Sequence, residues 1–365
     1  MADSADRQRT MRAWRTHRYG PRPTEVLQLD AVPIPEPQAG EVRVRVQAIP
    51  LNLNDLERIN GGNMMVQPEL PYSPGMEVMG IVDTCGAGTE SFRGRRVVAM
   101  PRGAHGGFAE YAVCPVVSAF EMPAEIPLPA AAALYFPFHL AWLGLFDRAD
   151  LRAGESVLIH AAAGGAGSAA IQLAVNAGAR VFATAGSEAK LALCRELGAD
   201  VAINYNTSDF AKVVLEATEG RGVDVVYDNV GAAVMEKSMN CLAYNGRYLM
   251  MGFASDKRVA DEKLVVPRRV ALGNFKLCGV LLAYAQDDMA KMLKLGMGWS
   301  FASDRLGQQI MREILALVTT ERIKPVIGKV VDFAELPAAM EAMANRETVG
   351  RTIALVAGGA GAAQT

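Results

Sequence analysis

The sequence contains little cysteine and no excess of either charge. Its five cysteines are widely spaced and form no C-x-x-C pair, which excludes a four-thiolate zinc knot and favours a reduced compartment. Because 37 Lys and Arg nearly balance 39 Asp and Glu, nucleic acid and other polyanions are not expected partners. A hydrophobic content of 51% excludes a disordered chain.

A secretory signal and a convincing membrane span are missing as well. Met1 to Thr10 is polar, so we expect a cytoplasmic protein. Ile126 to Phe146 carries no Asp, Glu, Lys or Arg and approaches the length of a membrane span. Three prolines interrupt this stretch, and a short buried helix over Ala130 to Leu134 is the better interpretation.

The pattern of the sequence changes near Gly154. Before this residue, Glu41 to Ala48 alternates apolar and polar side chains, and closely spaced glycines separate short strands, as in a compact barrel-like sheet. After it, strands, glycine turns and helices alternate, which predicts a doubly wound parallel sheet in an α/β fold. We expect a first domain over 11–135, a second over 136–300, a return to the first over 301–357, and flexible ends at 1–10 and 358–365.

The strongest functional signal is a turn of small residues between an apolar strand, Val157 to His160, and a helix. The turn consists of Ala161, Ala162, Ala163, Gly164, Gly165, Ala166 and Gly167. Small residues at such a bend allow a pyrophosphate to approach the backbone N–H groups at the start of the helix. The alternative is a tight strand-to-helix connection that binds nothing.

The end of the next strand indicates which nucleotide is bound. NAD sites usually offer an Asp or Glu there to the ribose 2′-hydroxyl, and none occurs between Val181 and Ser187. Gly186, Ser187 and Lys190 instead provide a hydroxyl, a helix N-terminus and a cation, which favour the 2′-phosphate of NADPH. The alternative is that Ser187 only caps its helix.

These motifs resemble the zinc-independent quinone oxidoreductase (zeta-crystallin-like) branch of the medium-chain dehydrogenase/reductases. The similarity lies in the run from Gly154 to Gly167, in Leu197-Gly198-Ala199-Asp200 and in Asn204-Tyr205, and it extends from Met11-Arg12-Ala13 to Gly350-Arg351-Thr352. The resemblance implies a GroES-like β-rich catalytic domain and a Rossmann cofactor domain.

The resemblance also implies the cofactor contacts. Gly164 to Gly167, with Ala163, would hold the pyrophosphate, and Gly186, Ser187 and Lys190 the 2′-phosphate of NADPH. The adenosine side and the rest of the cofactor would be bordered by Tyr205, Gly252, Phe253, Val280 and Leu281. The strand that carries Val280 and Leu281 commonly pairs with its copy in this family, which implies a homodimer.

The resemblance implies chemistry without a metal. Zinc-dependent relatives carry Gly-His-Glu where this sequence has Gly75-Met76-Glu77, and a thioether is a poor ligand for catalytic zinc. Hydride transfer from NADPH to a quinone or to an activated alkene such as an enone is then expected. Asn52 and Asp55 match the family's active-site asparagine and acidic position, and they are equally well interpreted as turn and cap residues.

Three departures from the family leave the substrate open. Glu57 and Asn63 stand where tyrosines are common, and Leu140-Ala141 replaces Thr-Ala. His139 is either a proton donor or, more often for such a residue, a packed side chain, and His105 lies on a glycine-rich loop. The alternatives to a quinone or enone reductase are an enoyl-thioester reductase and a weakly catalytic nucleotide-binding protein with a structural or RNA-binding role.

Overall fold

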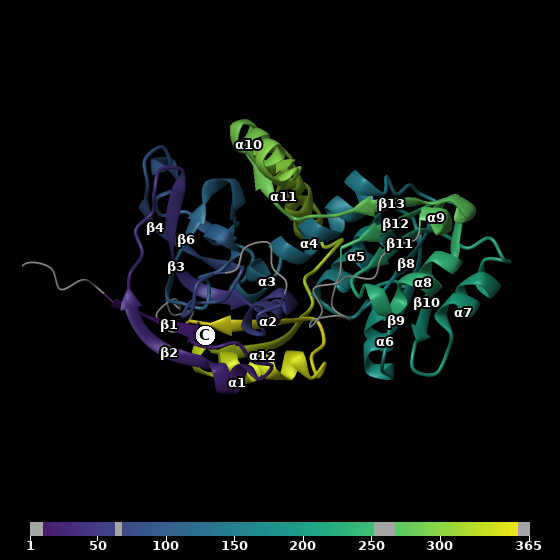
Figure 1. Cartoon of the computed structure of the whole chain (residues 1–365), viewed down its shortest axis with the longest axis horizontal. Helices are drawn as coiled ribbons and strands as arrows, with labels where there is room; N and C mark the ends of the chain where they lie inside the picture. The colour runs from purple at the N-terminus through teal and green to yellow at the C-terminus, as the bar shows by residue number, and fades with distance from the viewer. Residues whose placement is uncertain (1–9, 63–67, 252–266, 357–365) are drawn as a thin grey trace, which may run out of the picture. The chain divides into compact units, whose positions relative to one another are not determined.

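The structure, a computed structural model, describes residues 10–62, 68–251 and 267–356 (Figure 1). Its chain divides into unit 1, Met1–Tyr135 with Ile327–Thr365, and unit 2, Phe136–Val326. The chain thus returns to unit 1 at Ile327, later than the expected residue 301.

Packing of a long helix explains the later return. Helix α11, Asp304–Thr319, packs against other parts of unit 2. A Cβ on Gly307 would lie 3.1 Å from three ring atoms of Tyr284, and Trp142 Nε1 donates to Glu313 Oε2 at 2.8 Å. These contacts join residues 304–319 to unit 2, and no local sequence pattern reports them.

Unit 1 is built on a sheet with the strand order β16-β17-β3-β4-β5-β7, to which β6 adds by pairing with β3. The central strand β3 alternates buried and half-buried residues, and Val42, Val44 and Val46 face the core. β1 and β2 form a separate antiparallel ribbon. The strands are β1 Thr10–Thr16, β2 Leu27–Pro33, β3 Glu41–Pro50, β4 Val78–Cys85, β5 Arg96–Ala99, β6 Tyr111–Pro115, β7 Ala119–Glu121, β16 Ile327–Asp332 and β17 Arg351–Leu355.

The helices of unit 1 are short. They are α1 Pro23–Val26, α2 Leu53–Ile59, α3 Leu128–Ala132 and α12 Leu336–Ala344. Leu336 and Met340 of α12 and Leu56 and Ile59 of α2 join one buried cluster with the valines of β3. Helix α2 therefore has a fixed position relative to the sheet, and this matters because α2 carries Asp55.

Unit 2 contains an entirely parallel sheet with the strand order β10-β9-β8-β11-β12-β13 (Figure 1). Counted from β8, this is the order 3-2-1-4-5-6 of a Rossmann sheet, in which the carboxyl ends of the strands form the ligand side. The expected fold class is confirmed. The strands are β8 Ser156–Ile159, β9 Arg180–Ala185, β10 Val201–Asn204, β11 Val223–Asp228, β12 Leu242–Met250 and β13 Lys276–Gly279, with a small pair β14 Tyr284–Ala285 and β15 Ala302–Ser303.

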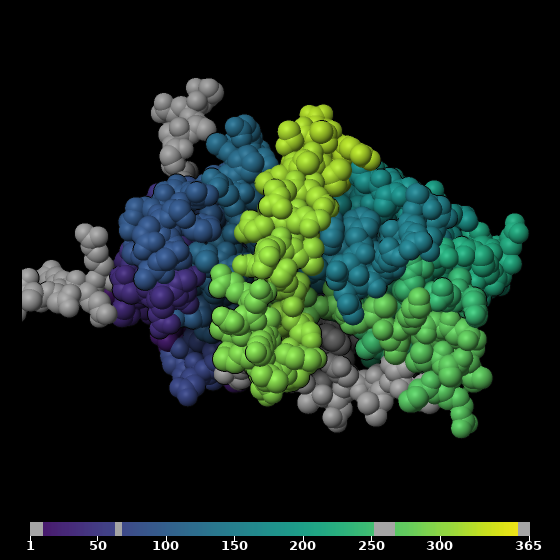
Figure 2. All heavy atoms as spheres, turned by 90° about the horizontal axis from the view of Figure 1, so that it is seen from above, coloured from purple at the N-terminus to yellow at the C-terminus, as the bar shows by residue number. Residues whose placement is uncertain are grey.

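Helices alternate with these strands. They are α4 Tyr135–Trp142, a π-helix Leu143–Arg148, α5 Gly165–Asn176, α6 Glu188–Glu196, α7 Phe210–Ala217, α8 Ala232–Asn240, α9 Pro267–Gly273, α10 Asp287–Met297 and α11. The apolar stretch Ile126 to Phe146 is divided among α3, α4 and the π-helix. Across the described ranges, no helix has both the length and the apolar character needed to cross a bilayer. Helices α10 and α11 form a continuous green to yellow-green band in Figure 2.

Candidate functional site

The small-residue turn lies at the carboxyl end of β8, the first strand of the Rossmann order. Ala161 adopts a positive φ of 50°, and its carbonyl accepts the N–H of Gly164 at 3.0 Å. A Cβ on Gly167 would lie 2.4 Å from the carbonyl oxygen of Ala161 and 2.6 Å from Cα of Ala162. Glycine is therefore required at 167, because any side chain would push the helix away from the turn.

Helix α5 begins directly after this turn. Gly164 is its N-cap, the side chain of Ala163 is buried, and the first turn of α5 holds no acidic residue. The N–H groups of Gly165, Ala166 and Gly167 lie in this first turn, where a helix offers no intrahelical acceptor. A helix start of this kind binds an anion through backbone N–H groups and the positive end of the helix dipole.

The second part of the candidate site lies at the ends of β9 and β10. Ser187 is the N-cap of α6, and its hydroxyl accepts the N–H of Lys190 at 3.5 Å, so the capping role is present. A Cβ on Gly186 would lie 2.5 Å from the hydroxyl oxygen of Tyr205, which places the half-exposed tyrosine directly against this glycine. The four predicted residues Gly186, Ser187, Lys190 and Tyr205 therefore come together at one corner.

Asn206 belongs to the same corner and is not identified by the sequence. Its side-chain amide donates to the carbonyl of Gly186 at 2.9 Å, and its backbone N–H donates to Asn204 Oδ1 at 3.0 Å. The first hydrogen bond joins the end of β10 to the loop after β9. The only signal in the sequence is an Asn that follows the Asn204-Tyr205 motif, and this residue type is common in turns for reasons unrelated to a ligand.

The remaining predicted cofactor residues lie near β12 and β13. Val280 continues the pairing of β13 with β12, because its N–H donates to the carbonyl of Met250 at 3.1 Å. The side chain of Leu281 is 44% exposed. Gly252 and Phe253 lie outside the described residues.

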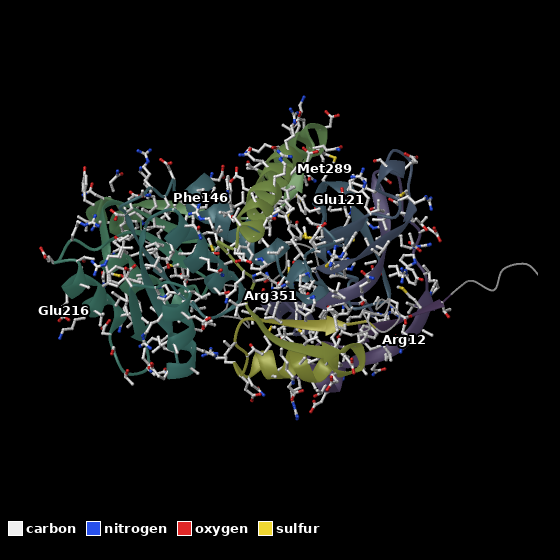
Figure 3. The ribbon with its side chains drawn as sticks, turned by 180° about the vertical axis from the view of Figure 1, so that it is seen from behind. Arg12, Glu121, Phe146, Glu216, Met289 and Arg351 are labelled. Atoms are coloured by element: carbon white, nitrogen blue, oxygen red, sulfur yellow. The ribbon has the colours of Figure 1, made fainter. Side chains whose placement is uncertain are left out.

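In unit 1, Asn52 and Asp55 occupy the start of α2. Asn52 is the N-cap, and its buried amide donates to the carbonyl of Pro50 and to Glu77 Oε2, each at 3.2 Å. Its oxygen accepts from Arg351 Nη1 at 2.7 Å, and Arg351 also pairs with Glu77. Figure 3 labels Arg351 on β17. Asn52 therefore caps helix α2, as one of the two interpretations expected. Contact of Asn52 with a substrate stays a prediction.

Asp55 connects α2 to the Gly75-Met76 turn. One carboxylate oxygen accepts the N–H groups of Gly75 at 3.2 Å and Met76 at 3.0 Å, and the other accepts the N–H of Asn52 at 3.2 Å. Complete burial raises the pKa of Asp55 to about 6, although the positive charge of Arg58 and the three N–H donors favour the anion. The pKa of Asp55 is therefore closer to neutral pH than that of an exposed aspartate.

The residues around Asn52 do not fit a catalytic zinc ion. Met76, which stands where the resemblance expects the histidine of zinc-dependent relatives, offers only a thioether, and Asn52 offers an amide. The carboxylate of Glu77 is the other group nearby that carries oxygen ligands, and it is paired with the guanidinium of Arg351. The positive charge of Arg351 opposes the binding of a metal cation beside it. Within the described ranges, no group of three His, Cys, Asp or Glu side chains is arranged to hold a metal.

Burial lowers the pKa of both histidines that the sequence left open. His139 is fully buried in α4, with Nδ1 2.7 Å from the hydroxyl oxygen of Tyr284, and burial lowers its pKa to about 3. Its ring is neutral at pH 7, which agrees with the packing interpretation. The pKa of His105 is lowered mainly by burial and, to a smaller extent, by the positive charges of Arg58 and Arg102. Asn63 lies outside the described residues.

Comparison with known proteins decides the family. Residues 38–124 match the family model of the alcohol dehydrogenase GroES-like domain, and residues 165–298 match that of the zinc-binding dehydrogenases. The synaptic vesicle membrane protein VAT-1 homolog of Rattus norvegicus is 32% identical over 325 residues, which cover 88% of this chain and 78% of the relative. The chain belongs to the medium-chain dehydrogenase/reductases.

Other relatives place the chain in the quinone oxidoreductase branch of this family. The quinone oxidoreductase-like protein 2 homolog of Nematostella vectensis is 35% identical over 237 residues, and the match covers 64% of this chain and 64% of that relative. Proteins named quinone oxidoreductase from several mammals also match. The resemblance expected from the motifs is therefore confirmed.

Solved structures of this family are similar over nearly their whole length. A mycobacterial protein solved in complex with NADPH has a TM-score of 0.80 and 27% identity, covering 94% of this chain and 99% of that one. An NAD-dependent alcohol dehydrogenase has a TM-score of 0.78 and 31% identity, covering 95% of this chain and 100% of that one. Membership of this family therefore indicates a fold that binds pyridine nucleotides. The choice between NADPH and NADH stays a prediction.

Proposed function

We propose that this medium-chain oxidoreductase uses NADPH to transfer hydride to a quinone or an activated alkene without a metal. The observation that carries the proposal is the corner at the ends of β9 and β10, where Ser187 caps α6, Lys190 lies in its first turn and Tyr205 packs against Gly186. No acidic side chain occupies the end of β9, where an NAD site places one. The positive end of the α6 dipole and the positive charge of Lys190 would both attract an anion to this corner.

The residues of unit 2 fit the cofactor. The glycine at 167 keeps the phosphate turn free of side chains, and the first turn of α5 supplies N–H donors for the pyrophosphate. Gly186, Ser187 and Lys190 hold the 2′-phosphate, and Tyr205 covers the adenosine side. When bound, NADPH supplies the hydride and its two electrons. The protein binds and orients the nucleotide.

Reduction also needs the developing negative charge on an oxygen atom to be stabilised and a proton to be added. Hydride addition to a quinone, or to the β-carbon of an enone, moves an electron pair onto the acceptor's oxygen, and a proton then completes the reduction, on that oxygen for a quinone and on the α-carbon for an enone. We propose Asn52 as a hydrogen-bond donor to that oxygen. Because the amide of Asn52 already donates to Pro50 and Glu77, it must give up one 3.2 Å hydrogen bond to do so.

A panel assay tests this function. Purified protein is mixed with NADPH or NADH and with quinones, enones or enoyl thioesters, and the loss of nicotinamide absorbance is followed. Turnover of quinones or enones with NADPH supports the proposal. Turnover of thioesters alone would assign the acceptor to the related reductases, and NADPH binding without turnover would support a weakly catalytic nucleotide-binding protein.

We also propose a cytoplasmic homodimer that forms through β13. Among the described strands β13 lies at the end of its sheet, and the side chains of Leu272, Leu277 and Leu281 near this edge are exposed. An exposed strand edge with apolar side chains is suited to pairing with a second copy. Light scattering coupled to size exclusion tests the mass, and a monomer at micromolar concentration would contradict this part of the proposal.

A further inference from the structure

A buried histidine directly precedes the phosphate turn. His160 directly follows β8, and the proposed reaction does not use its side chain. Its ring nevertheless contacts polar groups on two other elements. Nδ1 is 2.9 Å from the hydroxyl oxygen of Thr184 on β9, and Nε2 is 2.8 Å from that of Ser238 on α8. The residue is 1% exposed, so these contacts are shielded from water.

The hydrogen bonds around His160 determine which ring nitrogen carries the proton. Ser238 donates its one hydroxyl hydrogen to the carbonyl of Val234 at 2.7 Å, so it accepts from His160 and Nε2 carries the hydrogen. Nδ1 then accepts from the hydroxyl of Thr184. Burial lowers the pKa of His160 to about 3, which keeps the ring neutral and this direction of donation fixed near pH 7.

Thr184 also holds the phosphate turn through its backbone. Its carbonyl accepts the N–H of Ala162 at 3.1 Å, and Ala162 is the residue against which Gly167 packs. The hydroxyl and carbonyl of Thr184 therefore link the ring of His160 to the phosphate turn.

The backbone of His160 adds a connection to β11. Its N–H donates to the carbonyl of Tyr227 at 3.1 Å, and its carbonyl accepts from the amide of Asn229 at 3.3 Å. His160 is thus tied to β9, β11 and α8 at the side of the sheet where the strands end. A residue held on three sides and followed at once by the turn restricts the conformations that the turn can adopt.

We infer that His160 is a positioning residue for the dinucleotide, which holds the phosphate turn in its binding conformation through Thr184. The inference rests on the proposed function in that the ligand of the turn is a pyridine dinucleotide. It goes further by giving a role to a side chain that touches no substrate. Because the pyrophosphate is common to NADPH and NADH, the effect of His160 on affinity must be the same for both nucleotides.

Binding measurements on matched variants test the inference. His160→Leu and Thr184→Val each remove the hydrogen bond between ring and hydroxyl, and each is expected to weaken NADPH and NADH by the same factor, about tenfold. The double variant is expected to lose no more than either single variant, because both remove one interaction. His160→Asn keeps an acceptor where Nδ1 lies and is expected to recover most of the affinity.

Ser156→Ala is the control for a merely structural loss. Ser156 is equally buried at the other end of β8, where its hydroxyl donates to Asp224 Oδ2 at 2.9 Å. This variant is expected to lower stability and to leave both nucleotide affinities unchanged. If Ser156→Ala weakens the nucleotides as much as Thr184→Val does, His160 has no special part in positioning.

Hydrogen exchange separates this inference from the proposed function. In protein without nucleotide, the amides of residues 161–167 are expected to exchange faster in His160→Leu and Thr184→Val than in the unaltered protein or Ser156→Ala. Unchanged exchange, or folded variants that bind both nucleotides with unaltered affinity, would overturn the positioning role. Failure of the unaltered protein to bind either nucleotide would instead overturn the proposed function. Thr184→Val preserves shape and serves if His160→Leu does not fold.

Discussion

Replacing Gly167 by Ala tests the geometry of the phosphate turn. The added Cβ would lie 2.4 Å from the carbonyl oxygen of Ala161 and 2.6 Å from Cα of Ala162, and both neighbours are backbone atoms that cannot rotate away. Either the turn or the start of α5 must therefore move. Overpacking of this kind costs about 1–3 kcal/mol, which we expect to appear as lower stability of unit 2.

The same movement displaces the N–H groups that would bind the pyrophosphate. We therefore expect Gly167→Ala to weaken NADPH and NADH equally, by roughly 5- to 150-fold if about 1–3 kcal/mol of binding free energy is lost. Titration of nicotinamide fluorescence gives the two dissociation constants, and urea unfolding followed by circular dichroism gives the stability.

Gly296→Ala is the matched control. Gly296 lies in the exposed helix α10, which also carries Met289 in Figure 3, and a Cβ there would meet no atom within 4 Å. Alanine at this position should stabilise the helix by up to about 1 kcal/mol and leave nucleotide affinity unchanged. Unaltered affinity and stability in Gly167→Ala itself would refute the close packing of the turn against α5.

Three further predictions concern the other parts of the candidate site. Lys190→Glu should weaken NADPH far more than NADH, because it sets a negative charge against the 2′-phosphate; equal losses in a binding titration would remove Lys190 from that role. Asn52→Ala should lower kcat and leave the affinity for cofactor nearly intact, and unchanged turnover would leave Asn52 with its cap role only. Burial raises the pKa of Asp55 from 3.8 to about 6. The folded protein thus binds more protons than the unfolded one between about pH 4 and pH 6, so stability should fall by about 3 kcal/mol as the pH rises through this window. Asp55→Asn should remove that fall from a series of unfolding curves, and an unaltered pH profile would show that Asp55 does not titrate there.

The order of strands and helices in unit 2 follows from local sequence. Apolar runs that end in glycine turns and lead into helices are features of neighbouring residues, and a doubly wound parallel sheet is the arrangement that buries them. The phosphate turn is also a local feature, since small residues at 161–167 meet the conformational needs of the bend itself. The fold class and the expected cofactor turn were therefore open to prediction.

The contacts that hold the site together depend on the tertiary structure. Arg351 and Asn52 are 299 positions apart in the chain, and His160 and Ser238 are 78 apart. No periodicity links such pairs, because a side-chain hydrogen bond depends on where the backbone brings two residues and leaves no repeating pattern in the sequence. Local sequence determined the elements and the turn between them, and only the packed structure decided which polar side chains support that turn and that α11 stays with unit 2.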